Sequence, residues 1–376
     1  MTRPKASTRL AALSILACAA LALSACSGGS AAAGGELDMT TLKLEASQAS
    51  ELTELYNSAI DSGNTEVTIY AGHHDEFEGM YSKFEERFPG ITITPETYVG
   101  ADLQTTLEAE RQSGKHTAGV ISNPNADRYA EQGFAEAYTP VTFSVPSWTE
   151  GRISPDQIKD PKGFYFSPWA LFFSSSYNTN EIQEAELPGT WAELADPKWD
   201  GKITFMNPST PGGTMTVLTT LLDAGVVDKE WLTTVGGHAK IVAQDQLALQ
   251  SIISGEFAFQ PLSAATSVLN AKKDGAPVEV HFMDEDNAVA TEKWMLAANG
   301  PSPEASKLLM NYLFTAEAQE QTLAAGNFPI EQDPSITSPH GWPTLEDSKF
   351  VELPKQSHMR EAMVEYADLF KAIAKQ

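Results

Sequence analysis

Between residues 65 and 122, the apolar positions of the chain change their spacing several times. Residues 67–71 alternate between apolar and polar side chains, which predicts a strand. Residues 75–88 carry apolar side chains three or four positions apart, so they predict an amphipathic helix that ends at Pro89-Gly90. The same reasoning predicts a strand at 91–97, a helix at 101–112 and a strand at 119–122. Strands that alternate with helices indicate an α/β fold with largely parallel sheets.

A second group of strands and helices follows later in the chain. The pattern predicts strands at 239–243 and 256–260 and helices at 245–254 and 263–273. Helices are also expected at residues 42–60, 303–315, 317–325 and 359–375. We therefore expect two α/β lobes. In such sheets a ligand binds outside the carboxyl ends of the strands, next to the helix starts.

The first 26 residues predict export and a lipid anchor. Three basic residues precede a short run rich in Ala and Leu, which is typical of a secretory signal and short for a permanent membrane helix. The run ends in Leu23-Ser24-Ala25-Cys26, which resembles a bacterial lipobox. We expect a signal peptide at 1–25, lipidation of Cys26, and a flexible tether at 26–40 rich in Ser, Gly and Ala. The alternative is a plain signal peptide that is cut elsewhere.

Cysteine content and charge narrow the function further. The two cysteines, Cys18 and Cys26, lie in the predicted signal and lipid site, so the folded part is expected to have no disulfide and no thiolate chemistry. The chain carries 25 Lys and Arg against 50 Asp and Glu, a net charge of −25. Such a surface repels nucleic acid and anionic lipid. We expect a monomer outside the cytoplasm, on the extracellular face of the cytoplasmic membrane, that contacts the membrane only through the Cys26 lipid.

Several short segments, taken in order, resemble the bacterial extracellular solute-binding proteins of the ferric-binding-protein type, which deliver ligand to ABC importers. The similarity runs from about residue 66 to residue 333. The segments that carry it are FPGI at 88–91, LEAE at 107–110, SYNTN at 176–180, PGTWAELADPKWDGKI at 188–203, PEASK at 303–307 and EAQ at 317–319.

This resemblance implies a two-lobed clamp of the type II periplasmic-binding-protein fold. Hinge segments cross between the lobes, and the closed protein docks on a membrane permease that works with an ATPase. We expect the leading helix within 41–64, lobe 1 at 65–173 and 288–330, and lobe 2 at 174–287 and 331–376.

The segment 206–216, MNPSTPGGTMT, precedes an apolar helix expected at 217–224. Small hydroxyl residues and glycines at a helix start leave backbone N–H groups accessible, and the helix dipole favours an anion there. An ordinary N-cap turn is the alternative. In the resembling family the matching turn holds phosphate or the counter-anion of a metal. The candidate ligand residues are Ser209, Thr210, Gly212, Gly213 and Thr214.

His73 and His74 lie between a predicted strand end and a helix start. Adjacent histidines lack the spacing that brings several ligands to one metal. Iron-binding members of the family place a histidine at the position of His74, with a carboxylate after the third strand and a tyrosine pair in a later helix. Here residues 122–125 contain no carboxylate and 263–270 no tyrosine. We therefore expect no metal and interpret both histidines as hydrogen-bond donors at the cleft rim, with a merely solvated role left open. His74 would be an iron ligand only if the iron alternative holds.

Other polar residues could complete the cleft. Asn123 follows a predicted strand, and Ser175 and Tyr177 lie near the expected lobe crossing. Trp169 and Phe173 could wall the ligand or pack in the core. The chain contains no Gly-x-Ser-x-Gly, phosphate-loop or His-Glu-x-x-His motif, so we expect no enzyme, no catalytic residue and no cofactor.

Together these features predict the solute-binding lipoprotein of an ABC importer. The expected solute is a small organic molecule that carries a phosphate, phosphonate or carboxylate. One alternative is the ferric-iron-binding component of an iron importer. A second is a lipoprotein that senses a ligand for a signalling receptor.

Overall fold

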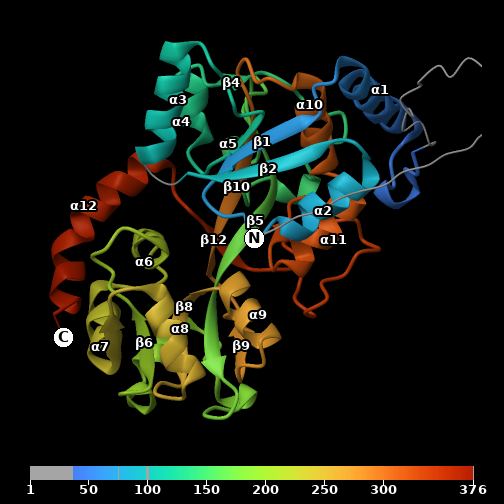
Figure 1. Ribbon diagram of the computed structural model, residues 1–376. Coiled ribbons are helices and arrows are strands. Elements are labelled where there is room, and N and C mark those ends of the chain that lie inside the picture. Colours follow the sequence, from blue (N-terminus) through green and yellow to red (C-terminus); the bar gives the residue numbers. More distant parts are fainter. Residues whose placement is uncertain (1–36, 75, 99–100, 376) are drawn as a thin grey trace, which may run out of the picture. The chain divides into compact units, whose positions relative to one another are not determined.

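A computed structural model describes residues 37–74, 76–98 and 101–375; for Gln356 and Ser357 it describes only the backbone. The predicted signal peptide, Cys26 and most of the tether lie outside the described residues. Residues 36–376 form one compact unit. Figure 1 shows it as two α/β lobes joined by long strands.

Lobe 1 is built on a sheet in the order β2-β1-β3-β10-β5. Strand β1 is parallel to both β2 and β3, whereas β10 is antiparallel to β3 and β5. The elements of this part of the chain are α1 (Ala46–Ser62), β1 (Glu66–Ala71), α2 (Glu78–Arg87), β2 (Thr92–Thr97), α3 (Ala101–Ser113), β3 (Val120–Ser122), α4 (Ala126–Glu131), β4 (Ala135–Glu136), α5 (Pro155–Ile158) and β5 (Phe166–Asn178).

In lobe 2 the same sheet continues through β5 in the order β8-β6-β7. The strands and helices from here to the end of the chain are β6 (Ile203–Met206), α6 (Gly213–Asp223), α7 (Lys229–His238), β7 (Ala239–Val242), α8 (Asp245–Ile253), β8 (Phe259–Ala264), α9 (Ala265–Lys273), β9 (Val278–His281), β10 (Asn287–Ala297), α10 (Pro303–Tyr312), α11 (Ala316–Ala324), β11 (Phe328–Pro329), β12 (Phe350–Glu352) and α12 (Gln356–Ile373).

Strand β5 connects the two lobes. Its first half pairs with β10 and β11, and its second half pairs with β8 and β9. The change of partner falls between Phe172, which is opposite Val289, and Phe173, which is opposite Ala264. The chain thus crosses between the lobes as extended strand, whose backbone hydrogen bonds are satisfied on both sides of the crossing.

Each lobe has its own hydrophobic core. In lobe 1, the apolar face of α2 packs under β1 and α10, with Phe84 and Phe88 wholly buried beside Tyr312. Helix α1 lies on the outside of this lobe, where the Tyr56 hydroxyl donates to the Pro89 carbonyl at 2.8 Å. In lobe 2, α12 returns to cover α6 and α7, and Phe370 and Ile373 enter the core. None of the described helices is long and apolar enough to cross a membrane.

Most of the predicted helices and strands are present, but α2 and β8 begin later in the chain than predicted. Helix α2 begins at Glu78 rather than at residue 75, because the turn in which Phe77 N–H donates to the His74 carbonyl precedes it. The strand expected at 256–260 is β8, which begins at Phe259. The N–H groups of Glu256 and Phe257 bond back to the Ser251 carbonyl, so this stretch still caps α8. The sheet is also less parallel than expected, since β5 and β10 run antiparallel to their neighbours.

Candidate ligand-binding site

The start of α6 borders a small cavity in lobe 2. The cavity measures about 180 Å³. Gly213 and Thr214 line it, and a Cβ at Gly213 would lie 3.5 Å from the ring of Phe173. No side chain caps this helix start, and its first turn contains no acidic residue. The first backbone N–H groups of a helix lack intrahelical acceptors, and the first two residues of α6 line this cavity.

Hydrogen bonds within the loop before α6 hold its conformation. Asn207 Oδ1 accepts hydrogen bonds from the Ser209 N–H at 2.8 Å and from its hydroxyl at 2.7 Å. The Thr210 N–H donates to the Asn207 carbonyl at 3.1 Å. Neither Ser209 nor Thr210 lines the cavity. The structure therefore brings Gly213 and Thr214, but not the two hydroxyl residues before them, to the cavity.

Two further residues of this cavity escaped the sequence analysis. Ser263, at the end of β8, is 5% exposed, and its Oγ has no hydrogen-bond partner among the described residues. Asp245, the first residue of α8, accepts a hydrogen bond from Gln260 Nε2 at 2.7 Å, and burial raises its pKa to about 6. Both stand where a strand ends or a helix starts, which is the signal that could have identified them.

His74 has a structural role within lobe 1. It is 8% exposed, its Nε2 lies 3.0 Å from the Glu96 carbonyl, and its Nδ1 lies 3.0 Å from the Tyr81 hydroxyl. A carbonyl can only accept, so Nε2 carries the proton and Nδ1 accepts from Tyr81. Both ring nitrogens are occupied in this structure. The ligand-binding role of His74, or its role as an iron ligand, stays a prediction and would require one of these partners to be given up, whereas His73 is exposed beside it.

A carboxylate absent from residues 122–125 is supplied by another strand. Glu292 of β10 accepts a hydrogen bond from the Ser122 hydroxyl at the end of β3. Burial, with a contribution from the charge of Glu76, raises the pKa of Glu292 to about 7, while His73 and Lys293 act in the opposite direction. Protein atoms surround the Glu292 side chain, but the residue is still partly exposed to solvent. In the sequence, Glu292 could have been identified as the single acidic residue within a largely apolar strand.

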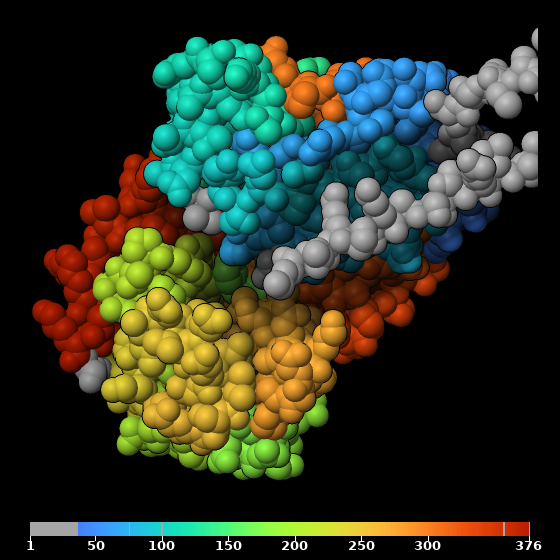
Figure 2. Space-filling model, in the orientation of Figure 1, coloured from blue at the N-terminus to red at the C-terminus, as the bar shows by residue number. Residues whose placement is uncertain are grey.

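Glu76 connects this group to the start of α9. Asn327, which is buried just after α11, donates from Nδ2 to Glu76 Oε2 at 3.4 Å. A Cβ on the preceding Gly326 would lie 3.0 Å from Leu269 and 3.6 Å from Ala265, both in α9 of lobe 2. The lobe 1 residues Glu76 and Glu292 therefore lie on the side of lobe 1 that meets lobe 2. Figure 2 shows that the surface is hollowed between the blue-to-teal part of the molecule and the yellow-to-orange part.

The remaining predicted residues divide into two groups. Asn123 is partly exposed; its backbone N–H donates to the Lys293 carbonyl, and its Oδ1 accepts from the Asn125 N–H. Ser175 is buried and donates to the Pro261 carbonyl at 2.8 Å, and Tyr177 is buried in the lobe 2 core. In this structure Ser175 and Tyr177 therefore contribute to hydrogen bonding and packing within lobe 2, and their ligand-binding role stays a prediction. Trp169 packs on Phe77 and Trp294 in the core, whereas Phe173 lines the cavity.

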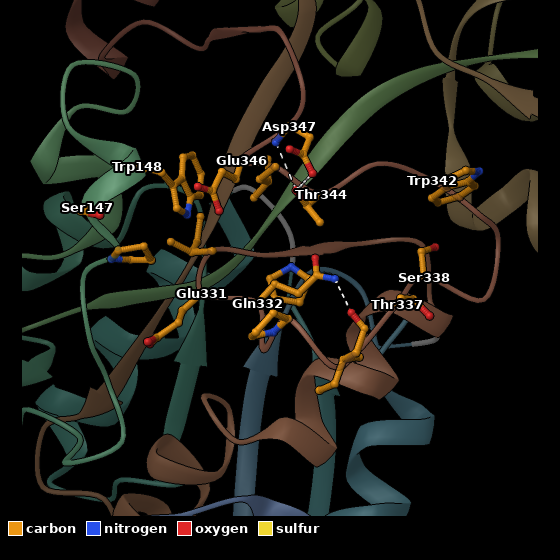
Figure 3. Close-up of a pocket in the computed structure, with 16 residues that line it drawn as sticks. Ser147, Trp148, Glu331, Gln332, Thr337, Ser338, Trp342, Thr344, Glu346 and Asp347 are labelled. Atoms are coloured by element: carbon orange, nitrogen blue, oxygen red, sulfur yellow. Dashed lines mark hydrogen bonds between the residues drawn. The ribbon is translucent and has the colours of Figure 1, made fainter.

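The described residues contain no group of three or more His, Cys, Asp or Glu side chains placed to hold a metal ion. A larger cavity, of about 560 Å³, lies elsewhere, among residues 146–148 and 329–347 (Figure 3). Trp148, Glu331 and Gln332 are among its lining residues, and none of the predicted ligand residues is. No start of an α-helix is among the described residues that line this larger cavity. The candidate site therefore remains the α6 cavity together with the lobe 1 residues described above.

The chain belongs to a family of bacterial extracellular solute-binding proteins, whose model matches residues 79–335. Among curated proteins it is similar to the major ferric iron-binding protein of Neisseria gonorrhoeae, with 23% identity over 195 residues, 51% of this chain and 56% of that protein. The match thus spans little more than half of the relative.

Solved structures share the fold. Iron-bound HitA from Pseudomonas aeruginosa matches with a TM-score of 0.59 and 18% identity, covering 82% of this chain and 99% of that one. AfuA from Actinobacillus pleuropneumoniae, solved with exogenous fructose-6-phosphate, matches with a TM-score of 0.59 and 17% identity, covering 81% and 98%. The predicted family and the two-lobed periplasmic-binding-protein fold are thereby confirmed.

Proposed function

We propose that this protein is the substrate-binding component of an ABC importer and that it captures a small organic solute bearing a phosphate, phosphonate or carboxylate. The observation that carries the proposal is the α6 cavity. There, a helix start without a side-chain cap lines the same cavity as Ser263, a buried residue whose hydroxyl has no partner among the described residues. An anion accepts hydrogen bonds from both kinds of donor.

The proposed mechanism is capture followed by closure. The anionic group binds at Gly213 and Thr214 in lobe 2, with Gly212 giving access to the backbone. Closure of the lobes about β5 then brings His73 and Asn123 of lobe 1 onto the solute. Asp245, beside the anion, accepts a hydrogen bond from a hydroxyl or an acidic proton of the solute. The closed form docks on a permease and its ATPase, while the Cys26 lipid holds the protein at the outer face of the membrane.

Ferric iron is the second candidate. The curated relative is a ferric iron-binding protein, and lobe 1 offers Glu76, Glu292 and the exposed His73 as oxygen and nitrogen donors. Against it, Fe³⁺ favours anionic oxygen ligands, and α9 begins with Ala265, Thr266 and Ser267 where a tyrosine pair would be needed. A chelating anion bound at α6 would then have to complete the set of ligands around the iron.

The test is thermal unfolding of the tether-free domain with organic phosphates, phosphonates, dicarboxylates and ferric salts with and without phosphate. A solute at a hundred times its dissociation constant adds about 2.7 kcal/mol to the free energy of unfolding. Stabilisation by an organic anion alone supports the proposal. Stabilisation by ferric ion alone, with a visible charge-transfer band, would replace it with the iron function. Deletion of a neighbouring permease gene without loss of solute uptake would favour the sensing role.

A further inference from the structure

The cavity at the start of α6 has mostly apolar walls. Phe173, Met206, Val217 and Leu262 line it. Val217 is wholly buried and follows Gly213 by four positions, so both residues lie on the same face of α6. The apolar wall therefore begins directly beside the helix start at which the anion is proposed to bind.

Two apolar side chains approach the helix start itself. A Cβ on Gly212 would lie 3.4 Å from Met206 Cε, and a Cβ on Gly213 would lie 3.5 Å from Phe173 Cε1. A group that binds the backbone at this point therefore has a methionine methyl and an aromatic ring as near neighbours. Neither side chain offers a strong hydrogen-bonding group to a solute.

The polar groups of the cavity are few. Ser263 is 5% exposed, and its Oγ has no hydrogen-bond partner among the described residues. Thr214 brings a second hydroxyl residue to the lining. Among the described lining residues only Asp245 is ionisable, and its Oδ1 already accepts from Gln260 Nε2 at 2.7 Å. Burial raises the pKa of Asp245 to about 6, as expected beside walls that hold little water.

Charge supplies only part of the affinity at such a site. No Lys or Arg is among the described residues that line the cavity. An anion there meets a helix dipole and hydroxyl groups, and a helix dipole alone attracts an anion weakly. Burial of an apolar group adds affinity in proportion to the area that it removes from water. The walls described above offer that contribution.

The volume of the cavity sets the size of the apolar group. The cavity measures about 180 Å³. An engineered cavity of about 150 Å³ with Leu, Ile and Phe walls binds benzene. The space beside α6 therefore accommodates one six-membered ring or a branched aliphatic group of similar size.

We propose that the organic part of the solute is a compact apolar group of about the size of a benzene ring, which fills this cavity while the phosphate, phosphonate or carboxylate binds at the start of α6 and Ser263. This inference rests on the proposed function, because the anion holds the solute at α6. Aryl and branched alkyl anions are then favoured over sugar phosphates. The hydroxyl groups of a sugar would lose water against Phe173, Met206 and Val217 without gaining partners.

The experiment is titration calorimetry with phenyl phosphate, ethyl phosphate, glucose 6-phosphate and the neutral benzyl alcohol. We expect phenyl phosphate to bind at least about tenfold more tightly than ethyl phosphate, because it buries a larger apolar group with the same anion. Its heat-capacity change on binding should also be more negative, which is the marker of apolar burial. Glucose 6-phosphate should bind no more tightly than ethyl phosphate. Benzoate and propionate repeat the comparison for a carboxylate.

A pair of matched substitutions tests where the ring lies. Val217→Thr places a hydroxyl in the cavity wall and should lower the preference for phenyl over ethyl phosphate at least about threefold. Val235→Thr makes the same change at a buried valine of α7 that does not line the cavity, so the preference should stay unchanged. Met206→Gln repeats the test at a partly exposed wall residue, where the cost to folding is smaller. Thermal unfolding shows that each variant is folded.

The outcomes separate this inference from the proposed function. If phenyl phosphate binds no more tightly than ethyl phosphate, or if glucose 6-phosphate binds most tightly, the apolar group is overturned and the anion site stands. If benzyl alcohol binds as tightly as phenyl phosphate, or if none of these anions binds, the proposed anion site fails and this inference fails with it. A preference for phenyl phosphate that both Val217→Thr and Met206→Gln leave unchanged places the ring outside this cavity and also overturns the inference.

Discussion

The hydroxyl of Ser122 donates a hydrogen bond to Oε1 of Glu292, so the carboxyl end of β3 is tied to an acid on β10. Ser122 is paired with Trp294, two residues further along the same face of β10. Glu292 thereby places a carboxylate beside the end of β3, although residues 122–125 contain none. The acid reaches the site through strand pairing and not through the loop.

Glu292 makes a testable contribution to the pH dependence of stability. Its pKa rises from 4.5 to about 7 on folding. The folded protein therefore binds this proton more tightly than the unfolded chain does. The contribution is fully present below pH 4.5 and is lost as the pH rises through about 7. Between pH 5 and pH 8, Glu292→Gln should gain stability relative to wild type by about 2–3 kcal/mol. Urea unfolding of both proteins at the two pH values measures this gain, and parallel pH profiles would contradict the raised pKa.

Two substitutions of Gly213 distinguish the effect of an added charge on anion binding from the effect of an added side chain. The residue does not have a positive φ, and a Cβ there makes an ordinary 3.5 Å contact with Phe173. Gly213→Ala should therefore keep most of the affinity for an organic phosphate. Gly213→Asp places a carboxylate at the helix start and should weaken binding by a factor of ten or more, about 1.4 kcal/mol. Titration calorimetry compares the pair. Equal affinities of the two variants would show that the anion does not bind at the start of α6.

The alternating spacing of apolar positions was enough to predict the fold class and most of the elements. Helices such as α3 and α10 begin where the sequence predicted, because their amphipathic faces and start signals are local. The partners of β5 and β10 were not predictable in this way. Their antiparallel pairing depends on contacts between residues more than 80 positions apart, such as Phe173 with Ala264.

The candidate site was predicted only in part, for the same reason. Gly213 and Thr214 follow from a local signal, namely glycines at a helix start. Ser175 and Tyr177 were chosen for their chemistry near the crossing, but neighbouring strands bury both. Ser263 and Glu292 acquire their roles only when β8 and β10 take their places in the sheet. Burial, and not residue type, decides which polar groups face a ligand.

Ser263 and Ser175 form a matched pair of buried serines with opposite expected behaviour. Ser263 Oγ has no partner among the described residues, whereas Ser175 Oγ donates to the Pro261 carbonyl at 2.8 Å. Ser263→Ala removes no hydrogen bond in this structure, so the stability of the free protein should change by less than about 0.5 kcal/mol. It should weaken anion binding. Ser175→Ala should cost about 1 kcal/mol of stability and leave binding unchanged.

Thermal unfolding with and without ethyl phosphate measures both effects in one experiment. The free proteins report the stability change, and the shift on adding ethyl phosphate reports binding. If Ser263→Ala destabilised the free protein as much as Ser175→Ala, its hydroxyl would have an internal partner. The hydroxyl would then not be a free donor for an anion.

The adjacent histidines should also behave differently from each other. His74→Phe removes two hydrogen bonds of a buried ring and leaves the Glu96 carbonyl and the Tyr81 hydroxyl without this partner. It should therefore cost about 2–4 kcal/mol of stability, since each buried group left unsatisfied costs about 1–3 kcal/mol. The affinity for an organic phosphate should stay within about twofold of wild type, less than 0.5 kcal/mol.

His73 is exposed, so His73→Ala should leave the unfolding free energy within about 0.5 kcal/mol of wild type. If it faces the solute after closure, the affinity for ethyl phosphate should fall severalfold. Urea unfolding and calorimetry on the two variants distinguish the roles. A loss of affinity in His74→Phe at unchanged stability would restore His74 to the ligand set and would show that its bonds to Tyr81 and Glu96 open on binding.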